Sequence, residues 1–187
     1  MNVYDFDKTV FFPDSSVCFF FFCMKRFPWE VLRILPGAIM KALGYKMKKR
    51  NAKELKQQLF SFLKKVPDTK SLVESFWDVN NQRMASWYLL QKKSDDVIIS
   101  ASPDFLLRPQ CEKLGVFLIA TDMDPDSGKI RGENCHDREK TIRFRKQFPN
   151  AHIDSFYSDS LSDTPMAELA GHAFLVKKDR LYPWPKL

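Results

Sequence analysis

Apolar residues recur with two different periods along the chain, and the change between them divides the sequence. Between residues 15 and 91 apolar positions repeat every three or four residues, for example at Leu55, Leu59, Phe62 and Leu63. This spacing places apolar side chains on one face of a helix. No strand pattern of comparable quality interrupts the segment. The sequence therefore predicts a block of helices over residues 15–91.

Short apolar runs typical of buried strands lie on both sides of this helical block. They occupy residues 2–6, 97–100, 116–120, 153–157 and 173–176. Helical patterns over residues 138–148 and 164–170 separate the later runs, and a turn at 124–128 precedes a short returning strand at 129–132. Strands that alternate with helices indicate a mostly parallel sheet with helices on both faces. We therefore expect an α/β, Rossmann-like core with an all-helical insertion after the first strand.

Polar side chains follow three of the predicted strands, at the point where each strand ends. They lie in residues 5–7, 100–102 and 158–163, and Lys140 lies near the start of a late helix. In an open parallel sheet, ligands bind at the carboxyl ends of the strands. We expect carboxylates, hydroxyls and one ammonium group to meet at this edge of the sheet.

This combination of residue types suits phosphoryl transfer. A carboxylate such as Asp5 can attack phosphorus and form an aspartyl-phosphate, which splits one difficult step into two easier ones. A second carboxylate two residues on, Asp7, can protonate the leaving oxygen and then deprotonate the attacking water. Mg²⁺ prefers oxygen ligands and reduces the repulsion between a carboxylate and an anionic phosphate. A hydroxyl and a lysine can hold the non-bridging phosphate oxygens.

Four segments in order, each at a predicted strand end or helix start, form a recognisable set. They are residues 5–9 (DFDKT), 98–103 (IISASP), 132–140 and 157–163. The set resembles the motifs of the haloacid dehalogenase (HAD) superfamily, specifically the phosphoserine-phosphatase-like branch, subfamily IB, with a helical cap. This resemblance implies a catalytic core over residues 1–12 and 92–187 and a helical cap over residues 13–91.

The resemblance also implies roles for single residues, with Mg²⁺ as the cofactor. Asp5 would be the nucleophile and a metal ligand, and Asp7 the general acid and base with its backbone carbonyl on the metal. Asp159 would bind the metal directly, and Asp163 directly or through water. Dehalogenating members lack the second carboxylate of the first motif, so the presence of Asp7 indicates phosphoryl chemistry. The implied phosphate-binding residues are Thr9, Ser100, Ala101, Ser102 and Lys140.

Several of these residues have a simpler structural interpretation. Asp163 could be the N-cap of the helix that Pro165 begins, and Thr9 or Ser102 could cap or brace a loop. The histidines lack the spacing of metal ligands and are interpreted as surface or loop residues: His136, His152 and His172. Glycine is common in the family at three positions where this chain has another residue: Lys8, Ser158 and Ser160.

Charge favours anionic partners without choosing among them. The 30 basic and 23 acidic residues give a net charge of +7. Nine basic residues against the single acid Glu54 occupy residues 41–65. This run is either a solvated helix face or, with nearby aromatic residues, a patch that rests on anionic lipid. Core packing of the cap is the other interpretation of those aromatic residues, which are Phe11, Phe12, Phe19 to Phe22, Phe27 and Trp29.

We therefore expect a cytoplasmic, magnesium-dependent phosphatase that acts on a small phosphorylated substrate. The apolar run 17–24 is too short to cross a bilayer, no basic region leads into an apolar run at the N-terminus, and the four cysteines lack paired spacing. Phosphoserine is the substrate that the resemblance implies, and a lipid phosphate such as phosphatidylglycerophosphate is the alternative. A non-catalytic protein that binds membrane or nucleic acid is a third hypothesis. The acidic motifs, which would repel a polyanion, argue against nucleic acid.

Overall fold

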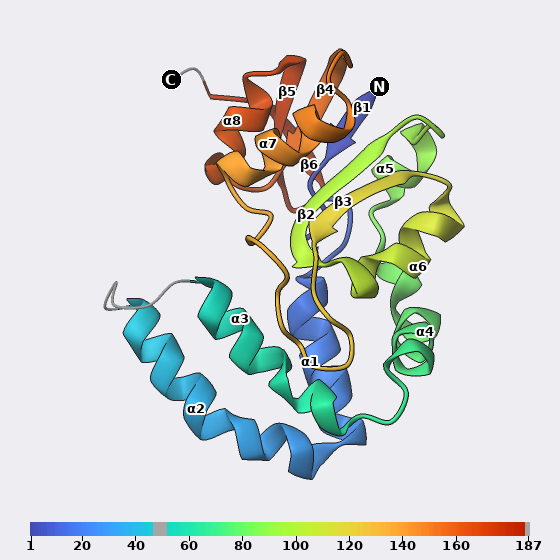
Figure 1. Ribbon diagram of the computed structural model, residues 1–187. Coiled ribbons are helices and arrows are strands. Elements are labelled where there is room, and N and C mark those ends of the chain that lie inside the picture. The colour runs from blue at the N-terminus through green and yellow to red at the C-terminus, as the bar shows by residue number, and fades with distance from the viewer. Residues whose placement is uncertain (47–51, 186–187) are drawn as a thin grey trace.

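A six-stranded sheet forms the centre of the molecule in the computed structural model, which describes residues 1–46 and 52–185. The spatial order is β3-β2-β1-β4-β5-β6 (Figure 1). The first five strands along the chain run parallel to their neighbours, and β6 runs antiparallel to β5. This confirms the prediction of a mostly parallel sheet. The strands are β1 (Asn2–Tyr4), β2 (Val97–Pro103), β3 (Phe117–Thr121), β4 (Ile153–Ser158), β5 (Ala170–Lys177) and β6 (Arg180–Pro183).

The edge strand β6 was not predicted. It pairs with β5 through a two-residue turn, Lys178 and Asp179, between Lys177 and Arg180. Both turn residues have positive φ, 47° and 62°, as in the tight hairpins that match the twist of a sheet. Asparagine and glycine usually signal such a turn, and neither residue occurs here.

Helices fill the chain between β1 and β2 and then alternate with the later strands. The first group is α1 (Ser15–Arg26), α2 (Pro28–Lys46), α3 (Ala52–Phe60), η1 (Ser61–Lys65), α4 (Thr69–Asn80), η2 (Asn81–Arg83) and α5 (Ser86–Gln91). The second is α6 (Asp104–Leu114), α7 (Arg138–Gln147), η3 (Leu161–Asp163) and α8 (Thr164–Ala167). Of the predicted basic run, Lys48, Lys49 and Arg50 lie outside the described residues, as do the side chains of Lys41 and Lys46.

The two faces of the sheet pack against different helices because successive strand residues point to opposite sides. Tyr4 and Ile98 join the core under α5 and α6, whereas Val3 and Val97 join the core under α7 and α8. Figure 1 shows α6 and α7 on opposite sides of the sheet. The prediction of helices on both faces is therefore confirmed.

The core under α6 continues into the helices that follow β1. Phe19, Phe60 and Phe76 are buried there, and the Phe19 ring forms aromatic pairs with each of the other two. Much of the phenylalanine content is thus core packing. Phe21 and Trp29, by contrast, are exposed.

The helical insertion is not uniform in its contacts. The indole N–H of Trp77 in α4 donates a 2.6 Å hydrogen bond to the carbonyl of Leu106 in α6. In contrast, α2 packs against α1, α3 and η1. Figure 1 shows α1, α2 and α3 projecting below the sheet. The division into a cap at residues 13–91 and a core around it stays a prediction, and we propose that α4 is its anchor to the core.

Two predicted elements differ in the structure. Residues 129–132 form one isolated bridge, between Ile130 and Met123, and no strand. Gly132 has a φ of 79°, which ends any extended run. The helix predicted to reach residue 170 ends at Ala167, because β5 begins at Ala170.

Truncation of the aromatic core should destabilise the whole fold. Phe76 is fully buried between Phe19, Phe22 and Trp77, so Phe76→Ala should lower the free energy of unfolding by about 3–5 kcal/mol. Val79→Ala, at an exposed position of the same helix, should change it by less than about 0.5 kcal/mol. Urea denaturation of both variants measures this difference, and equal losses would contradict the assignment of this core.

Candidate active site

The chain turns sharply directly after β1. The backbone N–H of Asp5 still donates to the carbonyl of Tyr157 in β4, and the N–H of Phe11 then returns to the carbonyl of Phe6. Lys8 lies in this turn with a φ of 58°. Glycine adopts this left-handed conformation without steric cost, which explains why glycine is common at this position in the resembling family. The turn keeps Asp5 and Asp7 at the carboxyl edge of the sheet.

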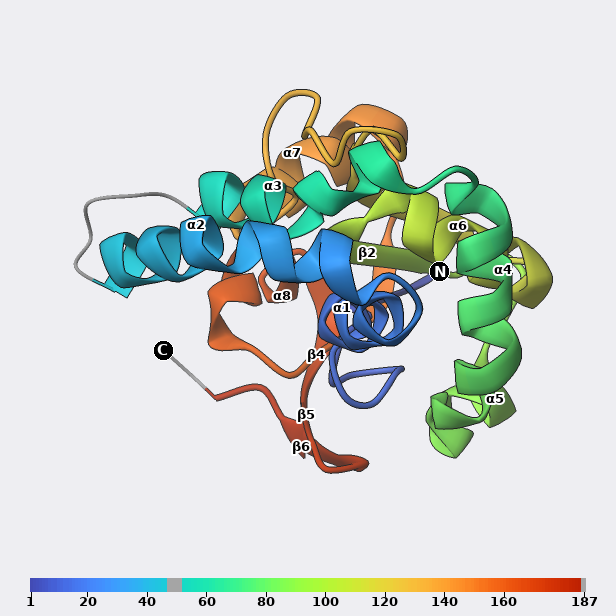
Figure 2. The same ribbon diagram turned by 90° about the horizontal axis from the view of Figure 1, so that it is seen from below.

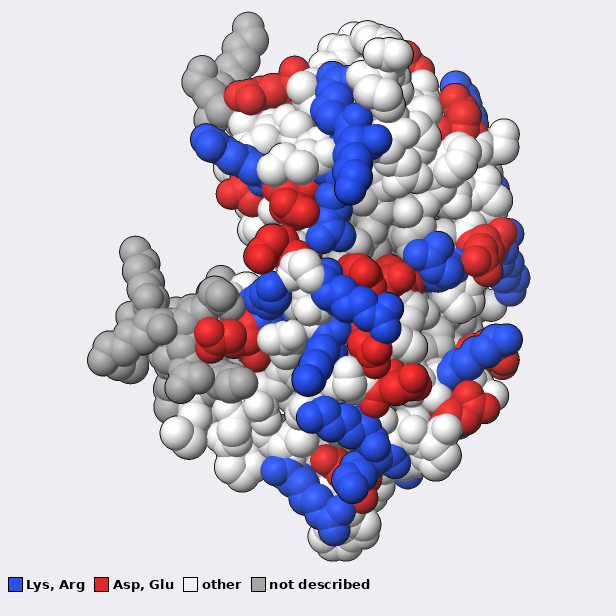
Figure 3. Space-filling model, in the orientation of Figure 1, with Lys and Arg blue, Asp and Glu red and all other residues white. Residues whose placement is uncertain are grey.

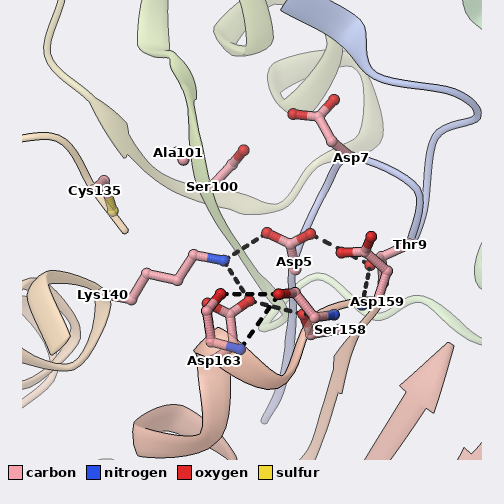
Figure 4. A network of polar contacts seen from close by, with 12 residues as sticks. Asp5, Asp7, Thr9, Ser100, Ala101, Cys135, Lys140, Ser158, Asp159 and Asp163 are labelled. Carbon is pink, nitrogen blue, oxygen red and sulfur yellow. Dashed lines mark hydrogen bonds and ion pairs between the residues drawn. The ribbon is translucent and has the colours of Figure 1, made fainter. Parts of the chain in front are cut away.

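Lys140 lies at the centre of a buried cluster of charges. Its Nζ donates to Asp5 Oδ1 at 2.5 Å and to Asp163 Oδ2 at 2.7 Å (Figure 4). The hydroxyl of Ser158, at the end of β4, also donates to Asp163 Oδ2. Lys140 is 2% exposed. Three segments that are distant in sequence therefore meet at one ammonium group.

Burial dominates the electrostatics of this cluster. It raises the pKa of Asp5, and the attraction of Lys140 opposes that rise only in part. Burial also acts to lower the pKa of Lys140, but Asp5 and Asp163 outweigh it and raise that pKa above its ordinary value. Lys140 is thus held as a cation, while the carboxylate charge around it is not fully balanced.

Asp7 points away from this cluster, as Figure 4 shows. Its Oδ1 accepts from the backbone N–H of Ser15 at 2.6 Å, and its Oδ2 accepts from the Ser102 hydroxyl at 2.5 Å. Burial raises the pKa of Asp7 to about 6, and the nearby charge of Asp14 contributes. The two aspartates therefore have different environments although they are two residues apart.

The end of β2 supplies the hydroxyls of the second segment. The register of β2 against β3 shifts between Ile99 and Pro103, and irregularities of this kind redirect side chains at strand ends. The N–H of Ser102 donates to Ser100 Oγ at 3.0 Å. Ser102 Oγ also contacts the hydroxyls of Ser15 and Ser16. The Ser102 side chain thus connects β2 to the start of α1. These contacts are those expected if Ser102 braces a loop.

Thr9 is a second brace. Its hydroxyl donates to Asp5 Oδ2 at 3.3 Å and accepts from the backbone N–H of Asp159 at 3.0 Å. Asp159 is partly buried, and burial raises its pKa. Asp163 is at the N-cap position of α8, but its side chain makes no capping bond and bonds Lys140 and Ser158 instead. Asp163 therefore occupies the N-cap position that the sequence offered as an alternative, but its carboxylate serves Lys140 and Ser158 and not the end of the helix.

A cavity of about 530 Å³ lies against these residues. Of the residues predicted for the site, it is lined by Asp5, Asp7, Ser100, Ala101, Ser102, Lys140, Asp159 and Asp163. Thr9 is fully buried behind them. Apolar side chains of α1 and α3 also line the cavity: Val17, Phe20, Leu55, Leu59 and Phe60.

Sequence reasoning missed several polar residues of the cavity. Asp14, Ser16 and His136 line it, and Asp14 also caps α1 by accepting from the N–H of Val17. Lys56 lines it from α3 and donates to the Ala101 carbonyl at 2.5 Å and to Asn134 Oδ1 at 3.0 Å. Burial lowers the pKa of Lys56. Lys56 lies within a long basic run, and nothing in the sequence distinguishes it from the other lysines of that run. Sequence reasoning therefore did not identify it as a residue of the site.

The loop between β3 and α7 connects α3 to the core beside Lys56. The N–H of Ile130 donates to Gln57 Oε1, and the hydroxyl of Thr69 donates to the carbonyl of Pro125. Gly128 has a φ of 68°, and a Cβ at this position would lie 2.3 Å from the carbonyl oxygen of Phe60. Only glycine fits this approach. The core and the helices after β1 therefore share the wall of the cavity.

The donor set fits a magnesium ion by its chemistry. In the part of the chain that the structure describes, no three His, Cys, Asp or Glu side chains already surround a common point. Asp5, Asp159 and Asp163 nevertheless offer carboxylate oxygens to one cavity. Burial raises the pKa values of Asp5 and Asp159, so a hard divalent cation would offset charge that Lys140 does not balance.

Sequence comparison finds relatives over most of the chain. A family model described as haloacid dehalogenase-like hydrolase matches residues 3–168. Protein CicA of Caulobacter vibrioides is 30% identical over 184 residues, which cover 89% of this chain and 81% of CicA. Probable phosphatase Rv3661 of Mycobacterium tuberculosis is 36% identical over 95 residues, which cover 46% of this chain and 33% of that protein.

Solved structures share the fold. A protein of unknown function from Bordetella pertussis Tohama I has a TM-score of 0.70 at 20% identity, covering 92% of this chain and 87% of the other. A substrate-bound phosphoserine phosphatase has a TM-score of 0.58 at 18% identity, covering 91% and 82%. At these identities the similarity shows a common fold.

Removal of the central cation should destabilise the protein in a pH-dependent way. Lys140→Met leaves Asp5 and Asp163 buried without their partner, which should cost about 3–5 kcal/mol at neutral pH. Burial raises the pKa of Asp5 and Lys140 opposes that rise, so in the variant folded Asp5 retains its proton at pH values where the unfolded carboxyl has lost it. Stability therefore falls as the pH rises above the ordinary carboxyl pKa.

Denaturation at about pH 5 and about pH 8 tests this pH dependence, since the deficit relative to the wild type should be larger at the higher pH. Lys146→Met, on an exposed position of the same helix, is the matched control and should show a small deficit at both pH values. A Lys140→Met deficit that does not change with pH would contradict the charge pairing.

Proposed function

The chain belongs to the haloacid dehalogenase-like hydrolase family, and we propose that it is a magnesium-dependent phosphatase of small phosphomonoesters, similar to phosphoserine phosphatases. One observation carries the proposal. Asp5 and Asp7 meet the same cavity, but Asp5 is paired with Lys140 and Asp7 with the Ser102 hydroxyl and the Ser15 N–H. A nucleophile and a proton donor need this difference in environment.

Asp5 is the proposed nucleophile. Its carboxylate oxygen forms a bond to phosphorus as the bond from phosphorus to the alcohol oxygen breaks, which leaves an aspartyl-phosphate. Lys140 and Ser100 hold non-bridging oxygens of the transferred group, where negative charge is spread in the transition state. The contact between Lys140 and Asp5 orients the carboxylate before the substrate arrives. Thr9 and Ser102 are proposed to brace the site, and a phosphate contact from Ala101 stays a prediction.

Asp7 is the proposed general acid and base. In its protonated form it gives a proton to the leaving alcohol oxygen; as a carboxylate it then takes a proton from the water that attacks the aspartyl-phosphate. That attack releases inorganic phosphate and restores Asp5. A pKa raised to about 6 gives access to both forms near neutral pH.

Magnesium is the proposed cofactor, and its positive charge would reduce repulsion between Asp5 and the anionic substrate. Asp5, Asp159 and Asp163 are the side chains proposed to hold it, together with the backbone carbonyl of Asp7. The backbone hydrogen bonds of this turn use the carbonyl of Phe6 and the N–H of Lys8. None of them uses the carbonyl of Asp7.

The leaving alcohol faces a mixed cavity wall, and two substrate classes fit it. Phosphoserine carries an ammonium and a carboxylate group, and Asp14 and Lys56 offer the opposite charges. A lipid phosphate of the phosphatidylglycerophosphate type is the second candidate, because the apolar side chains of α1 and α3 form a large part of the wall. Peripheral contact with an anionic membrane would accompany the second class.

A non-catalytic protein that binds nucleic acid or membrane remains the alternative from another class. The buried carboxylates at the cavity oppose it for nucleic acid, because they would repel a polyanion. No described helix is long and apolar enough to cross a membrane. Cys18, Cys23, Cys111 and Cys135 are all free thiols, and we propose the reducing cytoplasm as the location on that basis.

Asp5→Asn should abolish turnover. The neutral amide is too weak a nucleophile to form the aspartyl-phosphate, so hydrolysis of 4-nitrophenyl phosphate with Mg²⁺ should fall by at least about a thousandfold. Chelation of Mg²⁺ with EDTA should remove wild-type activity as well. A cooperative urea transition near that of the wild type controls for folding. If Asp5→Asn retained full activity in the presence of Mg²⁺, the proposed nucleophile would be wrong.

Asp7→Asn should affect substrates according to their leaving group. Alkyl phosphates need a proton on the leaving oxygen, so their turnover should fall about 10²–10⁴-fold. 4-Nitrophenolate leaves without that proton, so its release should show a fast first turnover followed by slow hydrolysis of the aspartyl-phosphate. Stopped-flow release of 4-nitrophenol against steady-state phosphate release measures this burst. Equal losses for both substrates, without a burst, would count against Asp7 as the proton donor.

A further inference from the structure

The outer face of α2 is an apolar stripe with no described packing partner. Helix α2 buries Val31 and Ala38 against its neighbours, seven residues or about two turns apart, as expected for one face. The opposite face leaves large apolar side chains in solvent, with Trp29 at 74% and Met40 at 69% exposure. We define the α2 face as Trp29, Leu32, Pro36, Ile39 and Met40, all of which are exposed.

This face belongs to the outermost layer of the molecule. Figure 2, seen from below, shows α2 crossing in front of the sheet, with α3 beside it. Helix α2 contacts α1, α3 and η1, and α1 and α3 in turn supply the apolar wall of the cavity. The α2 face is thus separated from the phosphatase site by one layer of helices. Its exposure cannot be explained by the site.

A shortage of core does not explain the exposure either. The same group of helices buries Phe19, Phe60, Phe62 and Phe76 almost completely. A cluster of exposed apolar side chains on one helix is uncommon on a monomeric protein surface and marks an interaction site. Each such side chain stabilises a complex when an apolar environment replaces water around it.

The charges around the α2 face are nearly all positive. Among the side chains that the structure describes, α1, α2 and η1 carry five basic residues and one acid, Glu30. Glu30 is already paired with Arg33 at 2.9 Å. Lys25 and Arg26 directly precede α2, and η1, which packs on α2, carries Lys64 and Lys65. All four are exposed, and Figure 3 shows basic side chains gathered at the lower end of the molecule.

We propose that the α2 face binds the surface of a membrane that contains anionic lipids. Trp29 and its apolar neighbours would enter the boundary between head groups and acyl chains, with the flanking lysines and arginines against lipid phosphates. A second copy of the chain is a poorer partner, because a two-fold interface would place like charges opposite each other. Nucleic acid would match the charges and leave the apolar stripe in water. The proposal is independent of the phosphatase activity.

Vesicle co-sedimentation with the full chain tests the proposal. The chain should bind vesicles of phosphatidylcholine with phosphatidylglycerol, bind vesicles of phosphatidylcholine alone more weakly, and dissociate as salt is raised. The variant Trp29→Ser/Ile39→Ser/Met40→Ser should reduce partitioning by at least about tenfold. Lys64→Gln/Lys65→Gln should reduce it roughly fivefold for each charge removed. Leu90→Ser, at an 88% exposed position of α5, is the matched control and should bind as the wild type does.

Three results would overturn the proposal. The first is that the wild type does not bind the anionic vesicles. The second is that the triple serine variant binds them as well as the wild type does. The third is that the wild type is a dimer and the triple variant a monomer, while neither protein binds vesicles. Hydrolysis of soluble 4-nitrophenyl phosphate by the triple variant should equal that of the wild type, because none of the three residues belongs to the site. Loss of vesicle binding together with full hydrolysis therefore supports the proposal, and a failure of the phosphatase assay leaves it intact.

Discussion

The buried ion pairs of Lys140 are the constraint on which the rest of the site depends. An ammonium group without water needs nearby carboxylates, and a carboxylate without water needs a cation. Asp5 follows β1, Asp163 follows β4 and Lys140 lies in the first turn of α7, so this requirement fixes three segments relative to one another. The same geometry leaves the Asp5 carboxylate oriented at the edge of the cavity. One interaction therefore both connects these segments and orients the Asp5 carboxylate, which is the proposed nucleophile.

A second set of contacts joins the sheet to the helices that follow β1. The Asp7 carboxylate is held by Ser102 at the end of β2 and by the N–H of Ser15 at the start of α1. Lys56 of α3 donates to the Ala101 carbonyl. The proposed phosphate end of the cavity is thus built largely by strand ends, whereas helices that come after β1 line the end where the alcohol is proposed to lie. Chemistry and substrate choice can change separately in such an arrangement, since they rest on different elements.

Local patterns in the sequence were sufficient to predict the five parallel strands and the residues of the charged centre. The β-branched runs gave the five parallel strands, and the rule that ligands gather at strand ends brought Asp5, Ser100, Lys140 and Asp159 to one edge. Contacts between distant segments were not visible in the same way. Nothing local distinguishes Lys56 from its basic neighbours. The turn between β5 and β6 lacks the asparagine or glycine that usually indicates a tight hairpin. The bracing role of the Ser102 hydroxyl likewise depends on how close α1 comes to β2.

The two apolar surfaces of the cap bear on the choice between the candidate substrates. Phe20 and Leu59 face the cavity, while Trp29 and Met40 face solvent on the next helix outward. A polar amino-acid phosphate would account for neither surface, because its own groups need only Asp14 and Lys56. If the substrate were a phosphomonoester with an apolar tail, the surface that faces the cavity would bind the tail. The surface that faces solvent would bind the membrane in which the substrate resides. Two observations that do not share a residue therefore support the lipid class, whereas family resemblance supports phosphoserine.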